Sequence, residues 1–241
     1  MNFVNEINIY MERKFYDLNI SFDKNFVQRA KKLGLSGICL VANSKENIED
    51  YLEKIKEIKK NETNIDIITG ILIDEKADKI LKIAKNVRRK VELVLVAGGN
   101  YEINRIACSS DYIDILCHPD KGRQDPGIDH ICCREAREHD TIIELNFREL
   151  LTATGMEKIR ELNKMKEIIR LCNKTKAKFI VNSGAKNIFE LRGGRELCSL
   201  SFCLGASLYD SLLANSEIAE KLILKNREKL NKKIAGVENG R

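Results

Sequence analysis

Short apolar runs of strand length alternate with helical patterns along most of the chain, and this alternation limits the possible folds more than any other feature. The seven apolar runs cover residues 15–20, 37–42, 64–73, 91–99, 112–117, 141–147 and 178–184. Between them, apolar residues recur three or four positions apart, as in Ile48, Leu52, Ile55 and Ile58, which is the spacing of an amphipathic helix. Strands that alternate with helices form right-handed βαβ units around a parallel sheet. The sequence therefore predicts an α/β fold with seven parallel strands.

Two arrangements of such a sheet fit the alternation, an open doubly wound sheet and a closed barrel. No GxGxxG motif follows the first run, which argues against a dinucleotide-binding open sheet. After Gly184 no eighth apolar run occurs, and the remaining sequence has helical patterns. We therefore predict a TIM-like (β/α) barrel of seven strands followed by C-terminal helices. Its 241 residues suit one barrel domain over residues 1–241, with a basic helical tail from about residue 217.

The net charge of +6 is concentrated in this tail, because residues 221–241 contain seven basic and two acidic side chains. We expect Ile218, Leu222, Leu224 and Leu230 to dock on the barrel while the lysines meet a polyanion. A solvated terminal helix is the alternative.

The cysteines and the first residues of the sequence indicate the cellular compartment. Eight cysteines occur, mostly within apolar runs, without a CxxC pair or a zinc-module spacing. The first fifteen residues include acidic side chains and no long apolar stretch, and no run reaches the roughly 20 residues of a membrane span. We expect a protein of the reducing cytoplasm, without a signal peptide and without a membrane partner.

The segment HPDKGRQDPG, residues 118–127, holds both prolines of the chain and two glycines. It follows the fifth apolar run and has no apolar side chain other than its prolines before Ile128. Proline and glycine end regular structure. We predict a loop that faces water or a charged partner, and we name residues 118–127 the His118 loop.

Catalytic groups are scarce at the predicted strand ends. Only three histidines occur, they form no HxH or HExxH pair, and His118 alone follows a strand. No cysteine or serine lies beside a histidine in a nucleophile pattern. Asp17 and Glu144 form either a carboxylate pair or, as we favour, supports for neighbouring Arg and Asn side chains. We predict no catalytic residue, no metal ligand and no cofactor bound by this chain.

Glycines and basic residues near the same strand ends suggest an anionic partner. Gly98, Gly99 and Gly184 permit a close approach of backbone to phosphate, although tight turns alone explain them. The basic residues predicted near this rim are Arg105, Lys121, Arg123, Arg148, Lys186, Arg192 and Arg195. Any one of them is as easily explained as a solvated surface charge.

Several motifs occur together and in a fixed order. They are DLN at 17–19, LGLSGI at 33–38, LVAGG at 95–99, NRIACSSDYIDILCHPDKGRQDPGIDHICCREAREHDTIIELNFRELL at 104–151 and VNSGAKNIFELRGGREL at 181–197. As a set they resemble the archaeal ribonuclease P protein component 3 family, which corresponds to the thirty-kilodalton protein subunit of the eukaryotic enzyme. The resemblance spans most of the chain.

This resemblance implies a barrel related to the polymerase and histidinol phosphatase (PHP) domains. Those relatives carry a metal-binding HxH in the first strand, where this chain has Asp17-Leu18-Asn19. The departure agrees with the scarcity of metal ligands.

The resemblance also implies a protein subunit of the ribonucleoprotein that removes the 5′ leader of precursor tRNA. Its RNA subunit would be the catalyst and would require magnesium. The implied partners are the ribonuclease P RNA, precursor tRNA, other ribonuclease P proteins and protein component 2, the last in a heterotetramer with two copies of each. The residues that we expect to contact RNA are Arg105, His118, Lys121 and Arg123, followed by Lys186 and Arg192.

Two readings from other classes remain open. One is a stand-alone metal-dependent phosphoesterase of the PHP class, which would bind metal and turn over without RNA. The other is a protein-binding scaffold without salt-dependent affinity for RNA.

Overall fold

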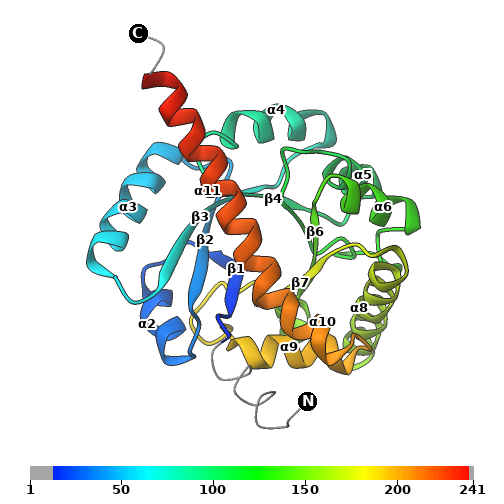
Figure 1. Ribbon diagram of the computed structural model, residues 1–241. Helices are drawn as coiled ribbons and strands as arrows, with labels where there is room; N and C mark the ends of the chain where they lie inside the picture. Colours follow the sequence, from blue (N-terminus) through cyan, green and yellow to red (C-terminus); the bar gives the residue numbers. More distant parts are fainter. Residues whose placement is uncertain (1–12, 239–241) are drawn as a thin grey trace, which may run out of the picture.

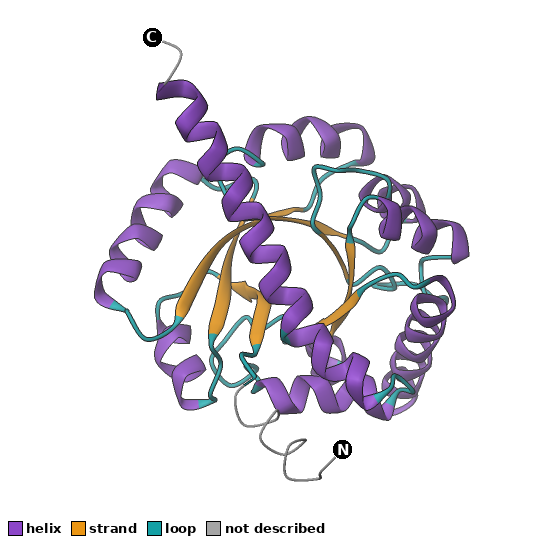
Figure 2. Cartoon of the chain, viewed as in Figure 1, coloured by secondary structure: helices purple, strands orange, loops and turns teal. Residues whose placement is uncertain are grey.

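Seven parallel strands form a single curved sheet in the computed structural model, which describes residues 13–238, with side chains through residue 231. The strands are β1 Tyr16–Ser21, β2 Gly37–Asn43, β3 Asp66–Ile73, β4 Leu93–Ala97, β5 Ile115–Cys117, β6 Ile142–Asn146 and β7 Phe179–Asn182. They lie in sequence order, each pairing in parallel with the next. Figure 2 shows that the sheet curls almost into a full circle. The predicted seven-stranded α/β barrel is confirmed.

Individual hydrogen bonds join β1 to β7 and bring the two ends of the sheet together. The Leu18 amide donates to the side-chain oxygen of Asn182 at 2.9 Å, and the Ser21 amide donates to the Ala185 carbonyl at 2.9 Å. Asn215, which follows the strands in sequence, donates its side-chain amide to one carbonyl of each strand. The seam of the barrel is thus held largely by asparagine side chains.

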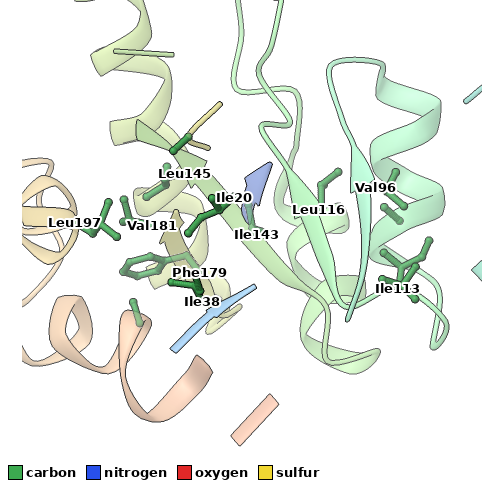
Figure 3. Close-up of a cluster of buried hydrophobic side chains, with 14 of the residues drawn as sticks. Ile20, Ile38, Val96, Ile113, Leu116, Ile143, Leu145, Phe179, Val181 and Leu197 are labelled. Carbon is green, nitrogen blue, oxygen red and sulfur yellow. The ribbon is translucent and has the colours of Figure 1, made fainter. Parts of the chain in front are cut away.

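Helices surround the sheet (Figure 1). They are α2 Asn25–Lys32, α3 Ile48–Asn61, α4 Ala77–Val87, α5 Tyr101–Cys108, α6 His130–Glu138, α7 Phe147–Thr152, α8 Gly155–Thr175, α9 Gly194–Cys203 and α10 Leu208–Asn215. The core between strands and helices is apolar; Figure 3 shows part of it, including Ile38, Leu116, Ile143 and Val181, all fully buried. Because helices cover the outer face of the sheet, the side chains that each strand points outward are aliphatic.

A last helix, α11 (Glu217–Glu238), crosses the open end of the barrel at the start of the strands (Figure 1). Ala219, Leu222 and Ile223 are buried there in a second core, with interior residues such as Leu93 and Ile115. The prediction that Leu222 docks on the barrel is therefore confirmed. The same prediction was wrong for Leu224, which is 52% exposed, because Ile223 occupies the buried position.

Charged side chains of α11 bind carboxylates at the start of the strands. Arg227 makes a two-pronged contact with Asp66, at 2.9 and 2.7 Å, and Lys225 pairs with Asp140. These two cations therefore attach the helix to the barrel, and a contact between the lysines of the tail and a polyanion stays a prediction. Lys232 and Lys233 have no described side chains, and Arg241 lies beyond the described residues.

Three local predictions differ from the structure. From the sequence, Ser44 is a plausible N-cap for the helix that follows the second strand, but the cap of α3 is Asn47, whose side chain accepts two backbone amides. Strand β5 is shorter than predicted, because the carboxylate of Asp114 accepts the Val94 amide just before the strand begins. Helix α7 was not predicted, since Asn146 ends β6 and at once caps a new helix.

All eight cysteines are free, and all but Cys203 are buried, as expected for thiols within apolar runs. Among residues 13–238, no helix combines the length and apolar character needed to cross a bilayer.

Candidate functional site

The carboxylate of Glu144 lies at the centre of a polar cluster inside the barrel, toward the strand ends from which the long loops leave. Its oxygens accept hydrogen bonds from the side-chain amides of Asn19 and Asn182, both at 2.8 Å, and from Asn146 at 3.2 Å. The backbone amide of His118 also donates to it, at 3.2 Å. Burial alone would raise the pKa of Glu144, but hydrogen bonding and attraction from His118, with the two asparagine amides, lower it. Glu144 therefore remains charged and fully buried.

Asp17, the second buried carboxylate of this cluster, behaves differently. It accepts the backbone amides of Ser183 at 3.2 Å and of Asn19 at 3.4 Å. Burial raises the pKa of Asp17 to about 7, and these hydrogen bonds compensate only in part. The acid therefore titrates near neutral pH at the seam between β1 and β7.

The cluster does not fit a metal ion of the kind that PHP enzymes hold. Metal ligation needs free lone pairs, whereas both oxygens of Glu144 face N–H donors. Within the described residues, no group of three or more His, Cys, Asp or Glu side chains is arranged to hold a metal. The interpretation of Glu144 as a support for neighbouring asparagines agrees with these contacts.

His118 connects this cluster to the His118 loop. Its backbone has a φ of 34°, and its side chain is only 7% exposed. The ring nitrogen Nδ1 lies 3.6 Å from Glu144, and Nε2 has no hydrogen-bond partner among residues 13–231. The ring is therefore turned toward the cluster around Glu144 and away from solvent.

Buried side chains fix the shape of the His118 loop. The side-chain amide of Asn104 donates to the carbonyls of Pro119 at 2.9 Å and Gly127 at 2.7 Å, which joins the two ends of the loop. From α8, Lys164 donates to the Asp120 carbonyl at 2.9 Å. The expectation that the whole loop faces water was wrong, because His118 and Asp120 are buried and take up these internal contacts.

Lys164 also lies between two buried acids. It lies 2.6 Å from Glu161 and 3.5 Å from the carboxylate of Asp120. Burial and the hydrogen bond with Glu161 raise the pKa of Asp120 to about 8. At neutral pH Asp120 therefore keeps its proton, and Lys164 is paired with the charged carboxylate of Glu161. A buried ion pair of this kind is costly to break, so the anchor of the loop is firm.

The tip of the loop projects outward with its basic residues. Lys121 is exposed, and Arg123 makes a two-pronged contact with Asp125 at 2.7 and 2.8 Å. Gly99 lies directly below, where a Cβ atom would come within 2.6 Å of the Lys121 carbonyl. This close packing explains Gly99 without a bound phosphate.

A second loop leaves β7 and carries Lys186 and Arg192. Lys186 is exposed, while the Arg192 guanidinium lies over the Phe147 ring, 5.4 Å from its centre. Arg105 is exposed on α5, over the ring of Tyr101. The predicted contact residues thus divide between the His118 loop, the loop after β7, and α5.

Arg195 does not belong with these residues. It borders a pocket with Arg13, Phe15 and Lys32, beside the residue that precedes β1. The chain descends along the barrel after Arg192, so Arg195 lies away from the rim on which we had placed it.

Sequence reasoning missed two residues that hold the His118 loop from within, Asn104 and Lys164. For Lys164 a signal was present, since it shares the apolar stripe of α8 with Met165, Ile168 and Cys172. A lysine on such a stripe must find buried acids. Nothing in the sequence distinguishes Asn104 from other asparagines on a helix.

Comparison with known proteins gives the family. A family model described as RNase P subunit p30 matches residues 14–231. Ribonuclease P protein component 3 of Methanococcoides burtonii is 30% identical over 237 residues, with 94% of each chain covered. The protein of the same name from Methanothermobacter thermautotrophicus is 28% identical over 200 residues, covering 80% of this chain and 81% of the relative.

Solved structures agree with the sequence comparison. A chain in the cryo-EM structure of archaeal ribonuclease P with mature tRNA has a TM-score of 0.79 and 27% identity, covering 90% of this chain and 93% of that one. A histidinol phosphate phosphatase from Lactococcus lactis, with a TM-score of 0.56 and 12% identity, covers 88% of this chain and 94% of its own and shares the fold alone. The resemblance inferred from the motifs is thereby confirmed, and this chain belongs to the RNase P subunit p30 family.

Proposed function

We propose that this chain is a protein subunit of ribonuclease P, the ribonucleoprotein that removes the 5′ leader of precursor tRNA. The observation that carries the proposal is the match of 90% of the chain to a protein of an archaeal ribonuclease P that was solved with mature tRNA. The relatives named ribonuclease P protein component 3 support it.

The chain binds and supports the catalytic RNA through backbone contacts. Phosphates repel one another, and lysine and arginine side chains at their surface reduce this repulsion, so that the RNA folds with less magnesium. The His118 loop presents Lys121 and Arg123 on a fixed scaffold, which suits this role. Since folded RNA is recognised chiefly by shape and backbone, we expect little base specificity from this loop.

Chemistry belongs to the RNA subunit and its magnesium ions in this proposal. The carboxylate best placed for catalysis, Glu144, is occupied by four N–H donors and is closed off from solvent. In this proposal the chain contributes no cofactor and no catalytic side chain.

The partners follow from the same proposal. They are the ribonuclease P RNA, precursor tRNA, protein component 2 and the other ribonuclease P proteins, all in the cytoplasm. We propose a heterotetramer with component 2 that contains two copies of each chain. The mass of the complex of the two purified proteins, measured in solution, tests this stoichiometry.

Cleavage of precursor tRNA at limiting magnesium tests the function. The RNA subunit is combined with component 2, with and without this chain, and this chain is also assayed alone. We expect stimulation only in the complete mixture. Turnover by the protein alone would instead support a stand-alone phosphoesterase, and an absence of stimulation in every mixture would support a protein-binding scaffold.

A further inference from the structure

The loop after β7 presents a phenylalanine almost entirely to solvent. Phe189 is 80% exposed, the highest value among the large hydrophobic side chains that the structure describes. A partner that covers this ring would remove a large apolar surface from water, which favours binding. We call residues 186–192 the Phe189 turn.

The Phe189 turn holds the ring in place through internal hydrogen bonds. The side chain of Asn187 accepts the Phe189 amide at 3.0 Å. The carboxylate of Glu190 accepts the Lys186 amide at 2.8 Å and the Arg148 side chain at 3.0 Å, which ties the turn to α7. Because its backbone is fixed, the ring is presented with little loss of conformational freedom on binding.

Cationic residues precede and follow Phe189 in the turn. Arg192 donates to the Phe189 carbonyl at 2.8 Å while its guanidinium rests on Phe147. Lys186 is exposed at the start of the turn, and Arg148 is paired with Glu190, the carboxylate within the turn. The surroundings of the ring therefore carry more positive than negative charge, which favours an anionic partner over an apolar protein surface.

We propose that Phe189 stacks on an unpaired base of RNA, and that Lys186 and Arg192 contact the phosphates beside it. Aromatic rings with neighbouring cations are the usual means by which proteins hold single-stranded RNA, because every base offers a flat face. This inference rests on the proposed function and adds a contact of a different kind from those of the His118 loop.

Four substitutions separate stacking from simple hydrophobic contact. In complexes reconstituted with component 2, Phe189→Ala should weaken binding to the ribonuclease P RNA, or to the RNA with precursor tRNA, by roughly 5- to 100-fold. Phe189→Trp should retain binding, since it keeps a ring, and Phe189→Leu should lose it as Ala does. Phe202→Ala, which removes a half-exposed ring on α9, should change nothing.

Crosslinking identifies what the ring touches. A photoreactive benzoyl group, introduced as Phe189→p-benzoylphenylalanine, should attach to RNA in the assembled enzyme. Attachment to a protein subunit, or equal RNA binding by wild type, Phe189→Ala and Phe189→Leu, would overturn the inference while leaving the proposed function intact. If the wild-type chain itself neither binds the RNA complex nor stimulates cleavage, the proposed function fails and the inference falls with it.

Discussion

The side-chain amide of Asn182 donates to the carboxylate of Glu144 at 2.8 Å. The carbonyl oxygen of the same side chain accepts the Leu18 amide across the seam between β1 and β7. One asparagine thus joins the closure of the barrel to its buried charge. In this chain, the strand ends that carry catalytic groups in many barrels hold hydrogen bonds that close the barrel.

Glu144→Gln should destabilise the protein strongly. The new amide would point an N–H₂ group at donors that now meet a carboxylate, and buried donors would lose their partners. We expect a loss of about 2–4 kcal/mol in the free energy of unfolding, measured with urea. Glu157→Gln, at an exposed position near the start of α8, is the matched control. Equal unfolding midpoints for the two variants would contradict the account of Glu144.

Stability should depend on pH through Asp17. Its pKa is raised from 3.8 to about 7, so the folded state binds a proton more tightly than the unfolded state does. The stabilisation is complete below about pH 4 and is lost as the pH rises to about 7, by at most about 1.4 kcal/mol per pH unit. The wild-type free energy of unfolding should fall relative to that of Asp17→Asn across this range. A difference that stays constant from pH 4 to 8 would refute the raised pKa.

The order and type of the strands were predictable because both faces of each strand are buried, which leaves continuous apolar runs. The predicted contact residues Lys121 and Arg123 were also found at a loop tip, since proline and glycine mark that loop. Their contacts with RNA stay a prediction.

The buried polar contacts were not predictable. Whether Asn182 or Asn104 is solvated or buried depends on residues far away in sequence, and composition carries no trace of it. The same holds for Ile223 and Leu224, which are adjacent aliphatic residues. Only the angle at which α11 docks on the barrel decides which of the two is buried. Arg195 was placed at the wrong end of the barrel, because no pattern in the sequence shows that the chain runs back toward the start of the strands after Arg192.

Ile223 and Leu224 provide a test of how α11 docks. Ile223→Ala should cost about 2–4 kcal/mol of stability, because it leaves a cavity at the floor of the barrel. Leu224→Ala should change stability by less than about 0.5 kcal/mol, since that side chain is half exposed. Thermal or urea unfolding measures both. A larger loss of stability for Leu224→Ala than for Ile223→Ala would show that α11 is rotated about its axis relative to this structure.

Removal of charge from the His118 loop should weaken RNA binding without unfolding the chain. With Lys121 and Arg123 both replaced by Ala, the slope of log affinity against log salt should become shallower by about 1.5, for two lost phosphate contacts. Lys56→Ala, on the exposed face of α3, is the control and should leave the slope within error. An unchanged slope in the double variant, with native stability, would remove these residues from the interface.

The magnesium dependence of precursor tRNA cleavage tests the central claim most directly. Rates are measured over a full range of magnesium concentrations for the RNA with component 2, with and without a saturating amount of this chain. A supporting subunit should shift the magnesium midpoint to lower concentration and leave the rate at saturating magnesium nearly unchanged. A midpoint that does not move, or cleavage that proceeds without the RNA subunit, would contradict it.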